Sequence, residues 1–484
     1  MGRIDYIHNL LLKREICAKE LAEKYLDSIQ RDNAALNAYV NITREEALSA
    51  ADRADEAFKK GEGYSLLTGI PMALKDNIST RDIETTCCSN MLKGYKPMYD
   101  ATVWSRLKAQ GAVLLGKTNM DEFAMGSSCE TSCFGAAHNP FDVTRSTGGS
   151  SGGSAGAVAG NLAVYSLGSD TGGSVRQPAS FCSVIGLKPT YGAVSRNGLV
   201  AFASSLDQIG PMAQMVEDAA VVFDAISGAD PLDSTCNKVY KTKTYDSLDD
   251  SVKGKTIGVV TELMEGIAPE VKTAIDKAVK IFESMGVNVV TLHIPEIYYA
   301  LPSYYILACA EASSNLARYD GIRYGHRTVE NFDSVHEMMV KSRSEGFGEE
   351  VKRRILMGTY VLSQGYYDAY YKKAQSLRQG LCEAFEKAFE KCDAIISPTS
   401  PTTAFRTGTK LSPVESYMAD VCTVPANITG IPAVSVCCGY SHHNLPVGLQ
   451  IMGRKFDEKT ILNFAYKFQQ ETDFLRTTDW GCVL

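Results

Sequence analysis

The sequence predicts an α/β protein in which one large domain is built on a mixed central sheet covered by helices. Short apolar runs with the length of buried strands alternate with amphipathic helical segments along most of the 484 residues. The composition is that of an ordinary globular protein, with 45% hydrophobic and 22% charged residues. Because no internal repeat and no clear linker divides the chain, we expect a single domain over residues 1–484.

Residues 1–65 form a predicted N-terminal helical region. Residues 15–60 show helical periodicity, and Thr43 and Glu46 have the spacing of a capping box. The apolar run Gly69–Lys75 then fits a buried strand. That strand ends at a lysine.

The segment Gly111–Thr118 has the spacing of a phosphate-binding loop. In such a loop the four variable residues turn their N–H groups toward phosphate. Here they are Ala-Val-Leu-Leu, which belong inside a strand, and the preceding segment Asp100–Gln110 fits a helix. We therefore predict a strand over residues 112–115 and no nucleotide site at this position.

Two stretches rich in glycine and serine, Ser146–Gly160 and Gly168–Pro178, lie in the first half of the chain. A flexible linker is one interpretation of such a composition. The glycines, however, separate ordered segments, because Ser154–Gly160 fits a tightly packed helix and Leu162–Leu167 fits a buried strand. Glycines in such places let the backbone approach a ligand or another segment, so we favour a functional site.

The second half predicts a β-α-β unit, then helices, then strands. The unit consists of strands over Lys255–Val260 and Val287–Leu292 around a helix over Pro269–Met285. Residues from about 295 to 390 are rich in Tyr, Arg and Glu at helical spacing, and we predict a helical insertion near the active site. The last predicted elements along the chain are strands over Ala394–Ile396, Ala433–Val436 and Val447–Met452 and a helix over Glu458–Gln469.

Charge and targeting signals limit the partners and the location. The formal net charge of -7 argues against binding of nucleic acid dominated by this chain's own charge. No apolar run reaches the length of a membrane span, and the N-terminus lacks the apolar core of a signal peptide, so we predict a cytoplasmic protein without a membrane contact. The 14 cysteines lack zinc-binding spacing and are expected to be reduced, so we predict no metal site.

The region rich in glycine and serine contains several serines but none of the seven histidines. A Ser-His-Asp hydrolase places its serine on an elbow between a strand and a helix. We assign that elbow neither to Ser150 nor to Ser151. We therefore expect a base other than histidine if this region hydrolyses a substrate.

The motifs around these serines resemble the amidase signature family. The residues that carry the resemblance are Ala73-Leu-Lys-Asp-Asn77, Gly148-Gly-Ser-Ser-Gly-Gly-Ser154, Gly168-Ser-Asp-Thr-Gly-Gly-Ser174, Arg176-Gln-Pro178 and Gly186-Leu-Lys-Pro-Thr-Tyr-Gly192. The resemblance implies the family's α/β fold and its Ser–cis-Ser–Lys triad. Carried over residue by residue, Ser174 is the nucleophile, Ser150 is the bridging serine on a cis peptide after Gly149, and Lys75 is the base.

These residue types suit the roles that the resemblance implies. A lysine base must be neutral, and burial lowers its pKa from the ordinary value of about 10.4. Neutral Lys75 can then take the proton of Ser150 while Ser150 takes that of Ser174. The expected oxyanion hole consists of backbone N–H groups from Thr171, Gly172, Gly173 and Ser174.

Motifs in the second half resemble one branch of the family, the glutaminase subunits of tRNA-dependent amidotransferases. They lie at residues 311–325, 343–348, 351–355 and 365–371. The resemblance implies hydrolysis of glutamine to glutamate and ammonia, with Arg354 at the α-carboxylate, Asp420 at the α-ammonium, and Tyr305 lining the pocket beside Tyr304. A fork of donors suits a carboxylate, and a carboxylate suits an ammonium. An exposed helix position for Arg354 and a cap for Asp420 are the alternatives.

The resemblance also implies partners. In that branch the glutaminase joins the B and C subunits of the amidotransferase in a heterotrimer, with ATP, Mg and mischarged tRNA held mainly by the B subunit, and no cofactor is expected in this chain. Ammonia would pass to the partner that amidates Glu-tRNA(Gln), Asp-tRNA(Asn) or both, and the sequence leaves this choice open. A free-standing amidase of small carboxamides is the alternative enzyme. A non-enzymatic scaffold would require the set Lys75, Ser150 and Ser174 to be accidental.

Overall fold

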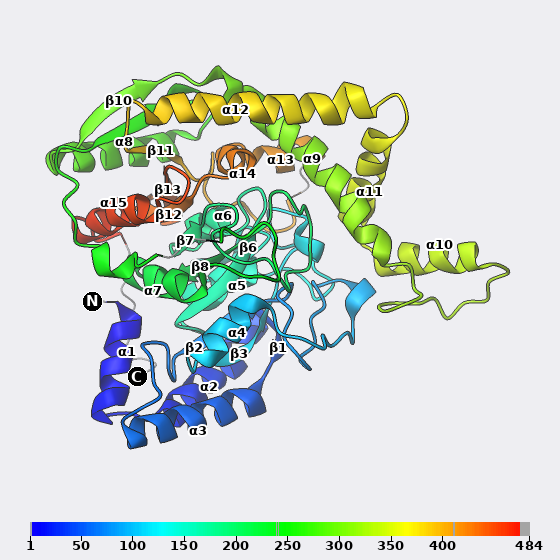
Figure 1. Ribbon diagram of the computed structural model, residues 1–484, viewed down its shortest axis with the longest axis horizontal. Coiled ribbons are helices and arrows are strands. Elements are labelled where there is room, and N and C mark those ends of the chain that lie inside the picture. Colours follow the sequence, from blue (N-terminus) through cyan, green and yellow to red (C-terminus); the bar gives the residue numbers. More distant parts are fainter. Residues whose placement is uncertain (1, 239, 241, 410–411, 475–484) are drawn as a thin grey trace.

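One mixed sheet runs through the protein (Figure 1). Within the residues that the computed structural model describes, 2–238, 240, 242–409 and 412–474, it has eleven strands in the order β1-β3-β2-β6-β8-β7-β12-β13-β11-β9-β10. Helices lie on both sides of it. The predicted fold class, an α/β domain with a mixed central sheet covered by helices, is confirmed.

The strands are short, and those in the middle of the sheet are buried. Their bounds are β1 Tyr39–Ile42, β2 Pro71–Lys75, β3 Val113–Thr118, β6 Tyr165–Asp170, β7 Ile185–Lys188, β8 Gln208–Ala213, β9 Thr256–Val260, β10 Asn288–Leu292, β11 Ala394–Pro398, β12 Ala433–Tyr440 and β13 Pro446–Met452. A separate two-stranded sheet pairs β4, His138–Asn139, with β5, Asp142–Ser146. Strand β2 runs parallel to both β3 and β6, so the carboxyl ends of these three strands meet at one edge.

The helices outside residues 295–390 are α1 Arg3–Lys13, α2 Ala18–Leu36, α3 Arg44–Lys60, α4 Thr102–Ala109, α5 Gly152–Ala159, α6 Arg176–Phe181, α7 Val216–Ile226, α8 Pro269–Ser284, α13 Pro413–Met418, α14 Val424–Thr429 and α15 Glu458–Gln470. Of these, α2, α3, α5, α6, α7, α8 and α15 pack against strands of the sheet. No helix among the described residues has the length and apolar character needed to cross a membrane.

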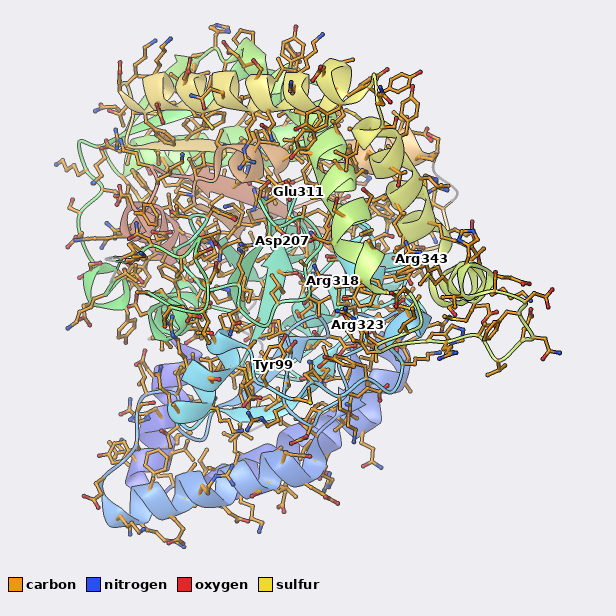
Figure 2. All side chains as sticks on the ribbon, turned by 45° about the vertical axis from the view of Figure 1, so that its right-hand side comes forward. Tyr99, Asp207, Glu311, Arg318, Arg323 and Arg343 are labelled. Atoms are coloured by element: carbon orange, nitrogen blue, oxygen red, sulfur yellow. The ribbon has the colours of Figure 1, made fainter. Side chains whose placement is uncertain are left out.

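The predicted insertion at residues 295–390 contains α9 Ala300–Asn315, α10 Val335–Gly346, α11 Glu349–Leu362 and α12 Lys373–Phe389. Figure 1 shows α12 along the top of the molecule, α9 and α11 side by side at the right, and α10 projecting from the body. Arg343 of α10 and Arg318 and Arg323, which follow α9, lie on this side of the molecule (Figure 2). Helix α9 is buried on several faces because it packs against α11, α12 and α14.

Several local predictions differ from the structure; the strands predicted over 112–115 and 433–436, for example, extend to Thr118 and Tyr440. The N-terminal helical region contains a strand, β1, because residues 39–42 pair with the exposed edge of β3. The predicted capping box is wrong, since the Thr43 hydroxyl donates to the carbonyl of Leu114 at 2.8 Å and accepts no N–H from the first turn of α3. Strand β6 starts and ends three residues later than predicted, because its ladder with β8 continues through Gly168 to Asp170.

Candidate active site

Lys75 is the last residue of β2, and its side chain is fully buried. Its ammonium nitrogen Nζ donates to Ser150 Oγ at 2.7 Å, to Ser151 Oγ at 2.9 Å and to the carbonyl of Ser169 at 3.2 Å. No carboxylate among the described residues forms an ion pair with it. Burial therefore prevails over the more distant carboxylates, such as Asp121, and lowers the pKa of Lys75 to about 8.

Ser150 lies in the loop between β5 and α5, and the Gly149–Ser150 peptide bond is cis, as the resemblance implied. A side chain at position 149 would collide with Asp121 Oδ2, so only glycine fits there. The Gly149 N–H donates to Gln177 Oε1 at 2.9 Å, which ties this loop to α6. Ser150 and Ser151 each stand at the centre of a Gly-x-Ser-x-Gly pentapeptide, yet the basic side chain that reaches them is Lys75.

Ser174 lies in the loop between β6 and α6, directly before the first turn of α6. Because β2 and β6 are parallel neighbours, this loop emerges at the same edge as Lys75. The backbone carbonyl of Ser174 accepts the Ser151 N–H at 3.0 Å. Ser174 is 8% exposed, whereas Lys75 and Ser150 are 0% exposed. Ser174 is therefore the only one of the three residues with surface that solvent or a ligand can reach. Within the described part of the chain no hydrogen bond joins the Ser150 and Ser174 hydroxyls.

The loop that carries Ser174 is held by Asp170, the last residue of β6. Its carboxylate accepts the N–H groups of Gly173 at 2.9 Å and Val175 at 3.1 Å, and pairs with the buried Arg176 guanidinium at 2.9 Å. Burial raises the pKa of Asp170, but Arg176 outweighs it and the pKa falls to about 2. The Gly173 N–H is therefore already paired, which leaves the N–H groups of Thr171, Gly172 and Ser174 as the candidates for the oxyanion hole.

Side chains of neighbouring segments lie directly against the glycines of the same loop. A side chain at Gly173, which has φ +137°, would collide with Thr423, and one at Gly172 would collide with the ring of Tyr304. The Thr171 hydroxyl donates to Asp207 at 2.6 Å. Asp207 is buried, and two residues before it the Ser205 hydroxyl donates to Glu311 of α9 at 2.5 Å; Asp207 and Glu311 are labelled in Figure 2. Helix α9 is thus hydrogen-bonded to the segment that carries Asp207.

Tyr305, Arg354 and Asp420 form a second group of side chains, which we call the recognition wall. Arg354, on α11, is 3% exposed, and its guanidinium lies 5.3 Å from the ring of Tyr305. The Tyr305 hydroxyl donates to Asp420 Oδ2 at 3.0 Å. The alternative of an exposed Arg354 is therefore wrong. Asp420 does accept the N–H groups of Thr423 and Val424 at 3.0 Å, but through its backbone carbonyl, so its carboxylate is not the cap of α14.

Asp420 is a buried carboxyl without an ion-pair partner among the described residues. The Ser127 hydroxyl lies 3.0 and 2.9 Å from its two oxygens. Burial raises the pKa of Asp420 to about 7, while Ser127, Tyr305 and the charge of Arg354 oppose this rise. Such a carboxyl gains from a cationic ligand, which would favour its charged form.

The recognition wall and the loop of Ser174 are adjacent. The Thr423 hydroxyl, three residues after Asp420, donates to the carbonyl of Gly172 at 2.6 Å. A cavity of about 330 Å³ opens beside Arg354, and its lining includes Glu122, Gly126, Ser127, Glu350 and Ser416. Arg354 lines this cavity directly, and Asp420 is joined to the lining through the hydroxyl of Ser127.

Several residues of the site were not predicted from the sequence. Ser127 and Glu350 contact the recognition wall, Ser151 contacts Lys75, and Asp170 holds the loop of Ser174. Asp170 and Ser151 stand inside the motifs quoted above and could have been singled out there. Ser127 and Glu350 have no such signal, because their importance arises only from contacts between segments far apart in the chain.

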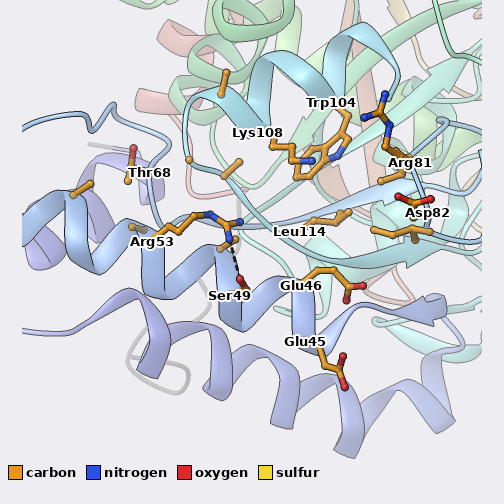
Figure 3. Close-up of a pocket in the computed structure, with 18 of the residues that line it drawn as sticks. Glu45, Glu46, Ser49, Arg53, Thr68, Arg81, Asp82, Trp104, Lys108 and Leu114 are labelled. Atoms are coloured by element: carbon orange, nitrogen blue, oxygen red, sulfur yellow. Dashed lines mark hydrogen bonds between the residues drawn. The ribbon is translucent and has the colours of Figure 1, made fainter. Parts of the chain in front are cut away.

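Two other features lie apart from this site. A cavity of about 670 Å³ between α3 and α4 has polar walls that include Glu46, Arg53 and Lys108, and none of the predicted site residues lines it (Figure 3). Lys117, in the rejected phosphate-loop segment, is buried within β3 and donates to the carbonyl of Ile78 at 2.6 Å. Its ammonium thus faces the protein interior.

Comparison with known proteins gives matches over nearly the full chain. The family model described as Amidase matches residues 20–462. The A subunit of glutamyl-tRNA(Gln) amidotransferase of Caldanaerobacter subterraneus subsp. tengcongensis is 55% identical over 473 residues, 97% of this chain and 96% of that protein. Among solved structures, the protein of the same name from Thermotoga maritima is 41% identical with a TM-score of 0.80, covering 94% of this chain and 92% of that one. The peptide amidase of Stenotrophomonas maltophilia is 29% identical with a TM-score of 0.83, covering 98% and 97%.

Proposed function

This chain belongs to the amidase signature family, and from that premise we propose that it is the glutaminase subunit of a tRNA-dependent amidotransferase, hydrolysing glutamine to glutamate and ammonia. The observation that carries this proposal is the recognition wall beside the serine-lysine site. A buried arginine that lines the cavity, and a buried aspartate bonded to Ser127 of the same lining, match the α-carboxylate and α-ammonium of a free amino acid.

We assign the base to Lys75, the bridging group to Ser150 and the nucleophile to Ser174. With a pKa near 8, Lys75 is neutral in part of the population at neutral pH and can accept a proton from Ser150. Ser150 then accepts the proton of Ser174 as Ser174 Oγ attacks the side-chain amide carbon of glutamine. The Ser150–Ser174 hydrogen bond that this transfer needs forms in the substrate complex, in which catalytic hydrogen bonds commonly shorten.

The attack produces a tetrahedral intermediate whose oxyanion accepts backbone N–H groups from the loop of Thr171, Gly172 and Ser174. The proton returns through Ser150 to the amide nitrogen, the C–N bond breaks, and ammonia leaves behind a glutamyl ester on Ser174. A water molecule, deprotonated through the same relay, then attacks the ester, and glutamate leaves as Ser174 regains its proton.

Arg354 and Asp420 hold the other end of glutamine in this proposal. The guanidinium binds the α-carboxylate, the Asp420 carboxylate binds the α-ammonium, and Tyr305 orients Asp420 through its hydroxyl. The ligand therefore supplies the cation that the Asp420 environment otherwise lacks.

The names of the relatives describe one component of a larger enzyme, so the proposed assembly has more than one chain. We propose that the partners are the B and C subunits of the amidotransferase in a heterotrimer, with ATP, Mg and mischarged tRNA bound at the B subunit. The formal net charge of -7 supports this division, because it argues against a dominant electrostatic contact between this chain and tRNA phosphates.

The test is purification of this chain with and without the B and C subunits, followed by glutaminase assays with mischarged tRNA and ATP. We expect a stable heterotrimer in which the tRNA substrate raises glutamine hydrolysis. A monomer with full activity toward small carboxamides, indifferent to partners and tRNA, would assign the chain to the free-standing amidases instead.

A further inference from the structure

Glu350 occupies the turn of α11 directly before Arg354, and its side chain is 13% exposed. Its Oε1 accepts the Nε–H of Arg354 at 2.8 Å and the hydroxyl of Tyr417 at 3.1 Å. Its other oxygen pairs with Arg353, whose side chain is 45% exposed. One carboxylate thus connects two arginines and a tyrosine at the mouth of the cavity.

This contact determines which part of the Arg354 guanidinium remains for a ligand. Nε is bonded to Glu350, and the two terminal NH₂ groups have no hydrogen-bond partner among the described residues. The guanidinium carbon lies 5.3–5.5 Å from the rings of Phe202, Tyr305 and Tyr417. Because these rings surround the guanidinium and Nε is already bonded, the open edge is the one that carries the two NH₂ groups.

A carboxylate binds a guanidinium best when two parallel N–H donors meet its two oxygens. Such a pairing requires a fixed rotation of the guanidinium about its Cδ–Nε bond, and the bond from Nε to Glu350 supplies that restraint. Tyr417 in turn restrains Glu350, and its ring stacks on that of Tyr305 at 4.0 Å between centroids. Tyr305 bonds Asp420, so the positions of the two charged groups of the recognition wall are linked.

We propose that Glu350 is a positioning residue that aims the Arg354 fork at the α-carboxylate of glutamine, with Tyr417 holding Glu350 in place. This inference rests on the proposed function, because it assigns a partner to the substrate carboxylate. It also has a competing physical effect to overcome. The charge of Glu350 weakens the positive field of Arg353 and Arg354, so removing that charge alone would strengthen attraction of an anion.

Three amide substrates separate these effects. Glutamine carries both charged groups, the monoamide of glutaric acid carries only the carboxylate, and 4-aminobutanamide carries only the ammonium. The enzyme, purified with its partner subunits, is compared as wild type, Glu350→Ala, Glu350→Gln and Tyr417→Phe. Glu20→Gln is the matched control, because this glutamate of α2 also pairs with a cation four residues on, Lys24, is 53% exposed and does not line the cavity.

We expect Glu350→Ala to raise KM about tenfold for glutamine and for the glutaric monoamide, with kcat little changed and 4-aminobutanamide unaffected. Glu350→Gln keeps an oxygen that can accept the Arg354 Nε–H, so its KM should stay within about threefold of wild type. Tyr417→Phe should raise KM by about threefold for the two carboxylate substrates alone. The control Glu20→Gln should resemble wild type.

Equal losses of Glu350→Ala toward all three substrates would reduce Glu350 to a structural residue and overturn the inference. A KM below wild type in Glu350→Gln would make its charge, and not its position, the relevant property. If Glu350→Ala does not fold, as judged by its thermal unfolding, Tyr417→Phe decides, and an unchanged KM in that variant overturns the inference. If the wild-type complex does not hydrolyse glutamine, both the proposed function and this inference are overturned. If the wild type is active and the variants have its KM values, only the role of Glu350 is overturned.

Discussion

The triad of Lys75, Ser150 and Ser174 and the recognition wall of Tyr305, Arg354 and Asp420 use burial in opposite ways. Lys75 is surrounded by hydroxyl and carbonyl oxygens and has no carboxylate bonded to it, so burial favours its neutral form. Arg354 is equally buried but is paired with Glu350 and surrounded by rings, so it keeps its charge. The same desolvation thus makes a base in one region, whereas in the other a paired carboxylate keeps the buried arginine charged.

Lys117 shows that burial alone does not make a base. It lies on β3, next to β2, and is as buried as Lys75, and burial likewise lowers its pKa. Its Nζ, however, lies 3.8 Å from Asp76 Oδ1 and donates to the hydroxyl of Thr85 at 2.9 Å. No serine hydroxyl reaches it among the described residues. The surrounding groups, and not depth, distinguish the proposed base from a structural lysine.

The largest expected effect comes from changing the triad. Lys75→Ala and Ser174→Ala should each lower kcat for glutamine by on the order of 10⁴-fold, because a serine without its base and a base without its nucleophile leave only binding and the oxyanion hole. Lys75→Arg sharpens the comparison, since arginine keeps a buried cation that cannot give up its proton. It should be as inactive as Lys75→Ala. Near-normal turnover in Lys75→Arg, or a glutamyl ester trapped on Ser150 by mass spectrometry, would contradict the assigned roles.

The next effect comes from the recognition wall. Arg354→Ala and Asp420→Ala each leave a charged group of glutamine without its buried partner, which costs about 2–5 kcal/mol in binding. kcat/KM for glutamine should therefore fall by roughly 30-fold or more, whereas an amide without either charged group should lose little. Measuring both substrates with each variant tests the contrast. Equal losses would show that these residues maintain the fold and do not recognise the substrate.

The pH dependence of the reaction separates the two regions without mutation. Lys75 must be neutral, so activity is lost as pH falls through about 8, and Asp420 must be ionised, so recognition of the ammonium is lost as pH falls through about 7. Below pH 7, kcat/KM for glutamine should fall by about a hundredfold per pH unit. The glutaric monoamide, which has no ammonium, should fall by about tenfold per unit. Identical profiles for the two substrates would remove Asp420 from ammonium binding.

Local sequence predicted the strand that ends at Lys75 and ordered segments between the glycines around Ser150 and Ser174, whereas the roles of these three residues came from the resemblance. The strand ending at Lys75 and the loop of Ser174 can be predicted from apolar runs and from the glycines that separate them. Recognition of Arg354, Tyr305 and Asp420 came from resemblance, since nothing in the periodicity of α9 or α11 distinguishes a ligand contact from a packed side chain. Ser127 and Glu350 could not be found in this way, because Ser127 meets Asp420 across 293 residues of chain.

Errors in the fold have a similar cause. Residues 39–42 read as part of a helix, but the open edge of β3 supplies hydrogen bonds that local propensity cannot anticipate. The Thr43 hydroxyl then bonds to Leu114 on that strand instead of capping α3. Tertiary pairing at the edge of the sheet thus outweighs the helical pattern.

The smallest expected effect concerns the hydroxyl groups that contact Asp420. Ser127→Ala and Tyr305→Phe each remove one donor to this carboxylate, and a hydrogen bond to a charged group contributes about 1.5 kcal/mol or more. Because those donors favour the ionised form, their loss should raise the pKa of Asp420 by about one unit. At pH 9, where Asp420 remains ionised, kcat/KM for glutamine should change only a few-fold, whereas at pH 7 the loss should approach tenfold. Ser313→Ala on α9, whose hydroxyl bonds the carbonyl of Ala310, is the control and should leave the profile in place. The prediction fails if the fall of kcat/KM for glutamine at low pH occurs at the same pH in both variants as in wild type. The group that titrates near pH 7 would then not be Asp420, and contacts other than these two hydroxyls would have to stabilise the charge of the recognition wall.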